Sequence, residues 1–138
     1  VPEEYQQYVE MVLKLPAMQV FKLNTIKIVQ CENTTNLDIL LQDNDKNNIH
    51  FRIKRYPYKI LRVRDSYIGY SFLEEYEVDG IKYEVFQKEE LEGKQSYIVY
   101  FYYGNVKYAI ATKVDESFIK TIAIEYGATV TESNNNKN

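Results

Sequence analysis

The chain has 138 residues, 45% of them apolar, and a formal net charge of −3. This length and apolar fraction suffice for one stable domain and exclude wholesale disorder. The negative net charge gives no overall attraction to nucleic acid or to an anionic membrane surface, and no apolar run reaches the roughly 18 residues of a membrane span.

The N-terminal segment predicts a helix. Proline at position 2, followed by Glu3 and Glu4, suits a helix start, because proline fits the first turn and carboxylates are stabilised near the positive end of the helix dipole. Apolar residues then recur at helical spacing until Pro16 ends the pattern. We expect this helix to lie on a sheet.

From Ala17 the apolar period changes to two, which predicts strands. The first covers 20–29 and is either one long strand or two with a bend near Asn24. Shorter strands are expected at 37–41 and 49–53, joined by the turn-forming residues 43–48. A further alternating segment covers 61–63, and 68–78 is either a weaker strand or a crossing loop.

The second half of the chain carries strong hairpin signals. Asp79-Gly80 and Gly104-Asn105 are typical of tight turns between antiparallel strands. The run 97–103 is apolar on both faces, so we expect it at the centre of the sheet with a helix over one side. The strand 106–111 follows.

The last element expected is a helix that starts at Asp115 as its N-cap and ends at Gly127 as its C-terminal glycine. The Asn-rich residues 131–138 are expected to form a disordered polar tail after a single domain over 1–130. The predicted fold class is α+β, with one curved antiparallel sheet and an N-terminal and a C-terminal helix packed on it. The 14 tyrosines suit half-buried positions on such a sheet.

Motifs for catalysis or metal binding are missing from the sequence. The single cysteine, Cys31, is expected to be a small buried residue of a strand, and the single histidine, His50, lies on another strand. The alternating acids of 43–48 lack the central glycine of a calcium loop, and Lys54 stands where its bidentate glutamate belongs. We therefore expect no catalytic residue, no cofactor and no metal site.

Charge distribution is the feature that points to a function. Six cations fall between positions 52 and 64 with no acid among them, and acids dominate the stretch that follows. If the strands at 49–53 and 61–63 pair, a basic stripe forms on the solvent face from Arg52, Lys54, Arg62 and Arg64. Such a stripe indicates a site for an anionic ligand, for example a cell-wall polymer or a lipid headgroup. The alternative is cross-strand salt bridging with the acidic stretch.

The segment 81–126 resembles the C-terminal part of the DUF4367 family. The residues that carry the resemblance are Tyr83, the aromatic strand 100–103, Gly104-Asn105, Lys107-Tyr108 and the helix pattern 118–123. The resemblance implies an extracytoplasmic domain of a Gram-positive cell-envelope protein, attached to the membrane through an anchor outside these residues. It further implies a likeness to the LolA/RseB group of half-barrels, whose sheet and helices enclose an apolar groove. The family defines no catalytic residue.

Three functions remain open. The first is a non-enzymatic sensory or binding domain for a lipid-like ligand, a cell-wall ligand or a protein partner, without nucleic acid. The second is a small cone-shaped α+β enzyme with a pocket lined by tyrosines and acids. The third is a purely structural interaction module. A buried carboxylate that faces a tyrosine within a pocket would favour the enzyme.

Overall fold

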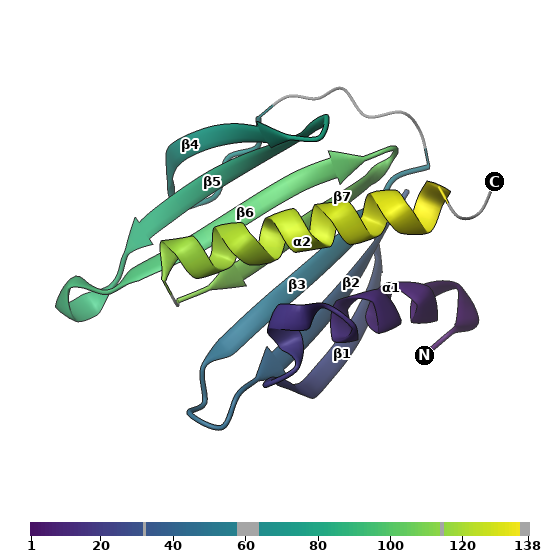
Figure 1. Cartoon of the computed structure of the whole chain (residues 1–138), viewed down its shortest axis with the longest axis horizontal. Coiled ribbons are helices and arrows are strands. Elements are labelled where there is room, and N and C mark those ends of the chain that lie inside the picture. The colour runs from purple at the N-terminus through teal and green to yellow at the C-terminus, as the bar shows by residue number, and fades with distance from the viewer. Residues whose placement is uncertain (32, 58–63, 114, 136–138) are drawn as a thin grey trace.

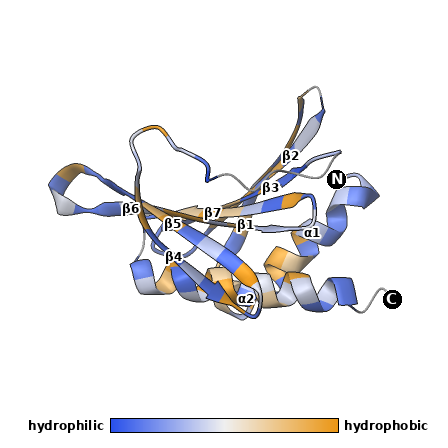
Figure 2. Ribbon diagram, turned by 90° about the horizontal axis from the view of Figure 1, so that it is seen from above, coloured by the Kyte–Doolittle hydropathy of each residue, from blue (hydrophilic) through white to orange (hydrophobic). Residues whose placement is uncertain are grey.

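The structure is a computed structural model that describes residues 1–31, 33–57, 64–113 and 115–135. One antiparallel sheet of seven strands runs in the order β1-β2-β3-β7-β6-β5-β4. The helices lie on one side of this curved sheet, and residues 64–70 cross its other side (Figures 1 and 2). The predicted fold class is therefore confirmed.

Most elements lie where the sequence predicts a strand or a helix, although several bounds differ by a few residues and the end of α2 by more. The strands are β1 (Lys22–Cys31), β2 (Thr34–Gln42), β3 (Asn48–Arg55), β4 (Ser71–Val78), β5 (Ile81–Glu89), β6 (Gln95–Tyr103) and β7 (Val106–Thr112). The helices are α1 (Glu3–Leu13) and α2 (Glu116–Asn135), and the short 3-10 turns are η1 (Pro16–Met18) and η2 (Leu91–Gly93). The segment at 61–63, expected to be a strand, lies outside the described residues.

The core fills the space between the helices and the sheet. Alternate residues of β2 and β3 face the helices and are buried, because side chains of a strand point to opposite faces in turn. Around α2, the ring of Tyr126 makes edge contacts with Phe51, Phe101 and Tyr108 at centroid distances of 5.5, 5.6 and 5.2 Å. This aromatic cluster fixes α2 against the middle strands.

The prediction that the last helix ends at Gly127 is wrong. Helix α2 runs on to Asn135, so residues 131–135 of the expected tail are helical, whereas 136–138 lie outside the described residues. A Cβ atom at Gly127 would overlap the hydroxyl oxygen of Tyr83 and would lie 2.9 Å from its Cζ. The glycine is thus present for close packing of helix on strand, not for a left-handed turn.

The predicted burial of Cys31 is also wrong. This cysteine is the last residue of β1 and is exposed, because β1 is an edge strand whose side chains are mostly in solvent. Of the two alternatives for the first strand, the structure has the single long strand, with a β-bulge between Leu23 and Thr25 where a bend was considered. Residues 71–78, for which a strand and a loop were both considered, form strand β4.

Candidate functional site

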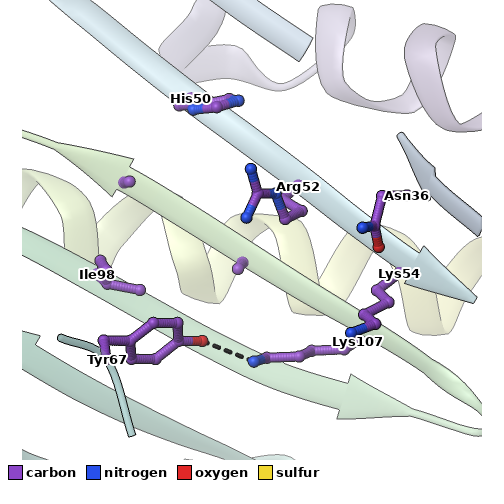
Figure 3. Close-up of a pocket in the computed structure, with 9 residues that line it drawn as sticks. Asn36, His50, Arg52, Lys54, Tyr67, Ile98 and Lys107 are labelled. Carbon is purple, nitrogen blue, oxygen red and sulfur yellow. Dashed lines mark hydrogen bonds between the residues drawn. The ribbon is translucent and has the colours of Figure 1, made fainter. Parts of the chain in front are cut away.

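The candidate site lies on the face of the sheet that points away from the helices, here called the open face. Strands β3 and β7 are paired in the register Arg52↔Ala109 and His50↔Ala111. The two alanine side chains are too short to fill the surface beside the long side chains of β3. A hollow of about 290 Å³ results, and Figure 3 shows the residues that line it.

One wall of the hollow is basic and comes from β3. The Nε atom of Arg52 donates a hydrogen bond of 2.7 Å to one carboxylate oxygen of Asp38 on β2, and Nη2 donates one of 3.3 Å to the other. These bonds hold the guanidinium over the hollow and raise the pKa of Arg52. Among the residues that the structure describes, Lys54 has no ion-pair partner, and its Nζ lies 5.4 Å from the centre of the Tyr56 ring.

Lys107 and Tyr67 form the opposite wall (Figure 3). The Nζ atom of Lys107 donates a hydrogen bond of 2.6 Å to the Tyr67 hydroxyl and pairs with Asp65 at 2.5 Å. Burial lowers the pKa of Lys107, and the bond to Asp65 opposes that change. Burial, followed by the charge of Asp65, raises the pKa of Tyr67, so this hydroxyl keeps its proton and can donate it to a ligand.

Residues 64–70 are tied to the sheet by tyrosine hydroxyls. The amide of Asp65 donates a hydrogen bond of 3.0 Å to the hydroxyl of Tyr100, which itself donates to the buried carboxylate of Glu84. The hydroxyl of Tyr102 donates to the carboxylate of Asp65 at 2.9 Å. The ring of Tyr67 also packs against Tyr100 at 6.1 Å. These contacts give the hollow a fixed wall.

His50 lies at the far end of the same wall as Arg52. Its Nε2 is 3.9 Å from a carboxylate oxygen of Asp38. Burial lowers the pKa of His50 below its usual 6.5, against the opposing effect of Asp38. The imidazole is therefore mainly neutral at pH 7 and adds no charge to the site.

The four cations of the predicted stripe do not form one surface. Arg52 and Lys54 line the hollow, whereas Arg62 lies outside the described residues. The neighbours of β3 are β2 and β7, so no pairing places Arg64 beside Arg52. Arg64 instead donates to Glu84 at 3.0 Å and to Glu75 at 3.3 Å. Arg64 is thus paired with two acids of the stretch that follows it.

Two residues of the site were not found from the sequence. Lys107 lies opposite Lys54 across the strand pair. The sequence signal that could have pointed to Lys107 is the alternating series Lys107, Ala109, Ala111, which gives one face of a strand only short side chains beside a lysine. Tyr67 lies in a segment without regular structure, and no periodic pattern marks it.

A buried carboxylate facing a tyrosine does occur, as the pair Glu84 and Tyr100. This pair does not line the hollow, and its other polar partners are Arg64 and the amide of Asp65. We therefore assign it the role of anchoring residues 64–70. Across the described ranges, no group of three or more His, Cys, Asp or Glu side chains is placed to hold a metal ion.

Neither helix, over the residues that can be described, is both long and apolar enough to cross a membrane. Comparisons with protein-family models, with curated proteins and with solved structures find no match to this chain. The resemblance to the DUF4367 family thus stays a prediction.

Proposed function

We propose that this protein is a binding domain whose ligand is a small anion held in the hollow of the open face. One observation carries the proposal: Arg52, Lys54 and Lys107 surround a cavity whose floor is alanine. Long cations beside short apolar residues leave space and positive charge in the same place. That combination suits an anionic group that replaces water in the hollow.

The donors of the hollow outnumber its acceptors. Among the described residues, no acceptor binds the three N–H groups of Lys54, and Arg52 keeps the N–H groups that Asp38 does not use. Tyr67 accepts from Lys107, which leaves its own proton to donate. An oxyanion with several oxygens, such as phosphate, matches this set of donors better than a neutral ligand does.

The charges of the site lead to the same conclusion. Arg52 is paired with Asp38 and Lys107 with Asp65, whereas Lys54 adds a charge that no described acid balances. The hollow therefore keeps a net positive charge within a chain whose net charge is −3. An anionic ligand would complete the charge balance.

Binding without chemistry is the function that this geometry favours. The raised pKa of Tyr67 makes its hydroxyl a poor base near neutral pH, and Lys107 is occupied by Asp65. We place the domain outside the cytoplasm, in a Gram-positive cell-envelope protein with a membrane anchor, on the strength of the DUF4367 resemblance alone. The apolar groove that the resemblance implies on the helix side is replaced in this proposal by the basic hollow of the open face.

Isothermal titration calorimetry with inorganic phosphate at pH 7 tests the proposal. We compare the wild-type protein with Lys54→Ala and with the matched control Lys14→Ala, which removes the same charge at the end of α1 on the helix side. Loss of a charge-assisted contact should weaken binding about tenfold in Lys54→Ala. The control should bind as the wild type does.

The proposal is refuted if the wild type does not bind phosphate, or if Lys54→Ala and Lys14→Ala bind it equally well. In the second case the affinity for phosphate would depend on the net charge of the protein rather than on the cations of the hollow. Circular dichroism of each variant confirms that the fold is kept.

A further inference from the structure

The hollow does not end at His50. A second hollow of about 390 Å³ adjoins it on the open face, and the two share His50 and Ala111 as lining residues. The far end of the second hollow is lined by Lys46, Lys113 and Glu90. Together the two hollows form a trough along β3 and β7, which we call the open-face trough.

The trough is long relative to a single anionic group. Along β3 it extends from Lys54 to Asn48, and along β7 from Lys107 to Lys113, the residue that follows the strand. At roughly 3.3 Å for each residue of a strand, either span is about 20 Å. A single phosphate would fill only one end.

Both ends of the trough are positive, and its middle is neutral. Arg52, Lys54 and Lys107 lie at one end, and Lys46 and Lys113 at the other. Between them lie the alanines of β7 and the neutral imidazole of His50. This spacing matches a ligand that carries negative charge along its length.

The acid at the far end, Glu90, reduces this charge without cancelling it. The carboxylate of Glu90 accepts a hydrogen bond of 2.8 Å from Ser96, and this bond, with the nearby charges of Lys88 and Lys113, lowers its pKa. Glu90 therefore stays ionised at neutral pH and offsets one of the two lysine charges of the lining, so the far end keeps a net positive charge.

The tyrosines beside the trough already pack against neighbouring side chains. The ring of Tyr67 makes edge contacts with Tyr70 at 6.4 Å and with Phe86 at 5.2 Å. The Nζ atom of Lys88 lies 5.8 Å from the centre of the Tyr70 ring. Proteins that bind single-stranded nucleic acids stack the bases on open aromatic faces, and the contacts of these two rings make them poor platforms for such stacking.

We propose, building on the anion site above, that the ligand is a linear chain of phosphate groups without bases, which lies along the open-face trough and contacts the cations at both ends. Its successive phosphate groups lie one after another along the floor formed by Ala109 and Ala111. A chain that reaches both ends gains the contacts of Lys46 and Lys113, which a single phosphate at the Lys54 end lacks.

Calorimetric titration with two probes tests this proposal: inorganic phosphate, and a linear polyphosphate longer than the trough. The wild type should bind the polyphosphate at least about tenfold more tightly than inorganic phosphate, with a steeper dependence on salt concentration. Lys113→Ala should weaken polyphosphate binding about fivefold and leave the affinity for inorganic phosphate unchanged. Lys14→Ala should change neither affinity.

Two results would overturn the inference. In the first, the polyphosphate binds no more tightly than inorganic phosphate, or Lys113→Ala affects both probes alike. In the second, a single-stranded RNA of similar charge binds more tightly than the polyphosphate, which would show that bases contribute. If Lys54→Ala left the affinity for inorganic phosphate unchanged, the anion site itself would be refuted. Failure of the trough proposal and failure of the anion site are therefore distinguishable.

Discussion

Substituting Gly127 by alanine tests the packing of α2 against β5. In an exposed helix interior, this change stabilises a protein by about 1 kcal/mol, because glycine is the weaker helix former. At position 127 the new Cβ would overlap the hydroxyl of Tyr83 and would lie 3.3 Å from Cδ1 of Ile81. We therefore expect the opposite sign.

The magnitude follows from how little Tyr83 can move. Its side chain is 1% exposed, is stacked on Tyr76 at a centroid distance of 4.9 Å, and contacts Phe101 at 5.2 Å. Overpacking of such a site costs roughly 1–3 kcal/mol, of which helix propensity offsets about 1. We expect Gly127→Ala to lower the free energy of unfolding by up to about 2 kcal/mol.

Urea unfolding followed by circular dichroism measures this change through the midpoint at constant m-value. Ala128→Gly is the matched control, because it reverses the substitution at the adjacent, exposed position of α2 and should cost about 1 kcal/mol. In a Tyr83→Phe background the clash is reduced, so Gly127→Ala should cost less there. The reasoning fails if Gly127→Ala stabilises the wild-type protein by as much as Ala128→Gly destabilises it.

Three further predictions follow from single side chains. The hydroxyl of Tyr126 is buried and, within the described part of the chain, has no hydrogen-bond partner, so Tyr126→Phe should raise the free energy of unfolding by about 1 kcal/mol in urea unfolding; a loss of stability would contradict this. Burial, followed by the charge of Asp79, raises the pKa of Tyr83 from 10.0 to about 12. The contribution of the protonated Tyr83 hydroxyl to the free energy of unfolding is therefore complete below pH 10 and is lost between pH 10 and 12, at about 1.4 kcal/mol per pH unit. Urea unfolding at several alkaline pH values should show a smaller fall in stability for Tyr83→Phe than for the wild type, and an equal fall would refute the assignment. Cys31 is exposed, so a thiol reagent should label the native protein in full without urea, and labelling only after unfolding would show that this end of β1 is covered.

The elements that the sequence predicts correctly are those with local signals. The Asp79-Gly80 turn has positive φ angles at both residues, as a tight hairpin turn between right-twisted strands requires. The alternation of Ile49, Phe51 and Ile53 with polar residues identified the buried face of β3. Turn chemistry and apolar period are contained in a few neighbouring residues, so no knowledge of the whole fold was needed.

The elements predicted wrongly depend on contacts that are distant in the sequence. Gly127 has the position and the residue type of a helix-ending glycine. A glycine is needed there because Tyr83, on strand β5 across the helix–sheet interface, leaves no room for a Cβ atom. Cys31 is exposed because β1 lies at the edge of the sheet. The place of a strand in the sheet order cannot be predicted from the residues of that strand alone. The local sequence pattern could not distinguish a helix-ending glycine from a glycine required by packing, or an edge strand from an inner strand.

The candidate site was predicted in part for the same reason. Alternation along β3 placed Arg52 and Lys54 on the open face. Their true neighbour across the sheet is Lys107 and not Arg64, because β3 pairs with β7. Identifying the hollow therefore required the pairing of strands that are about fifty residues apart in the chain.

The central claim is that an anion binds on the open face, between β3 and β7. The most direct test is a titration of the ¹⁵N-labelled protein with inorganic phosphate, followed by two-dimensional NMR spectra. We predict saturable shifts of the amide signals around Arg52, Lys54 and Lys107, with the signals of α1 unaffected. Shifts centred on the helices, or spread evenly over the surface without saturation, would contradict it.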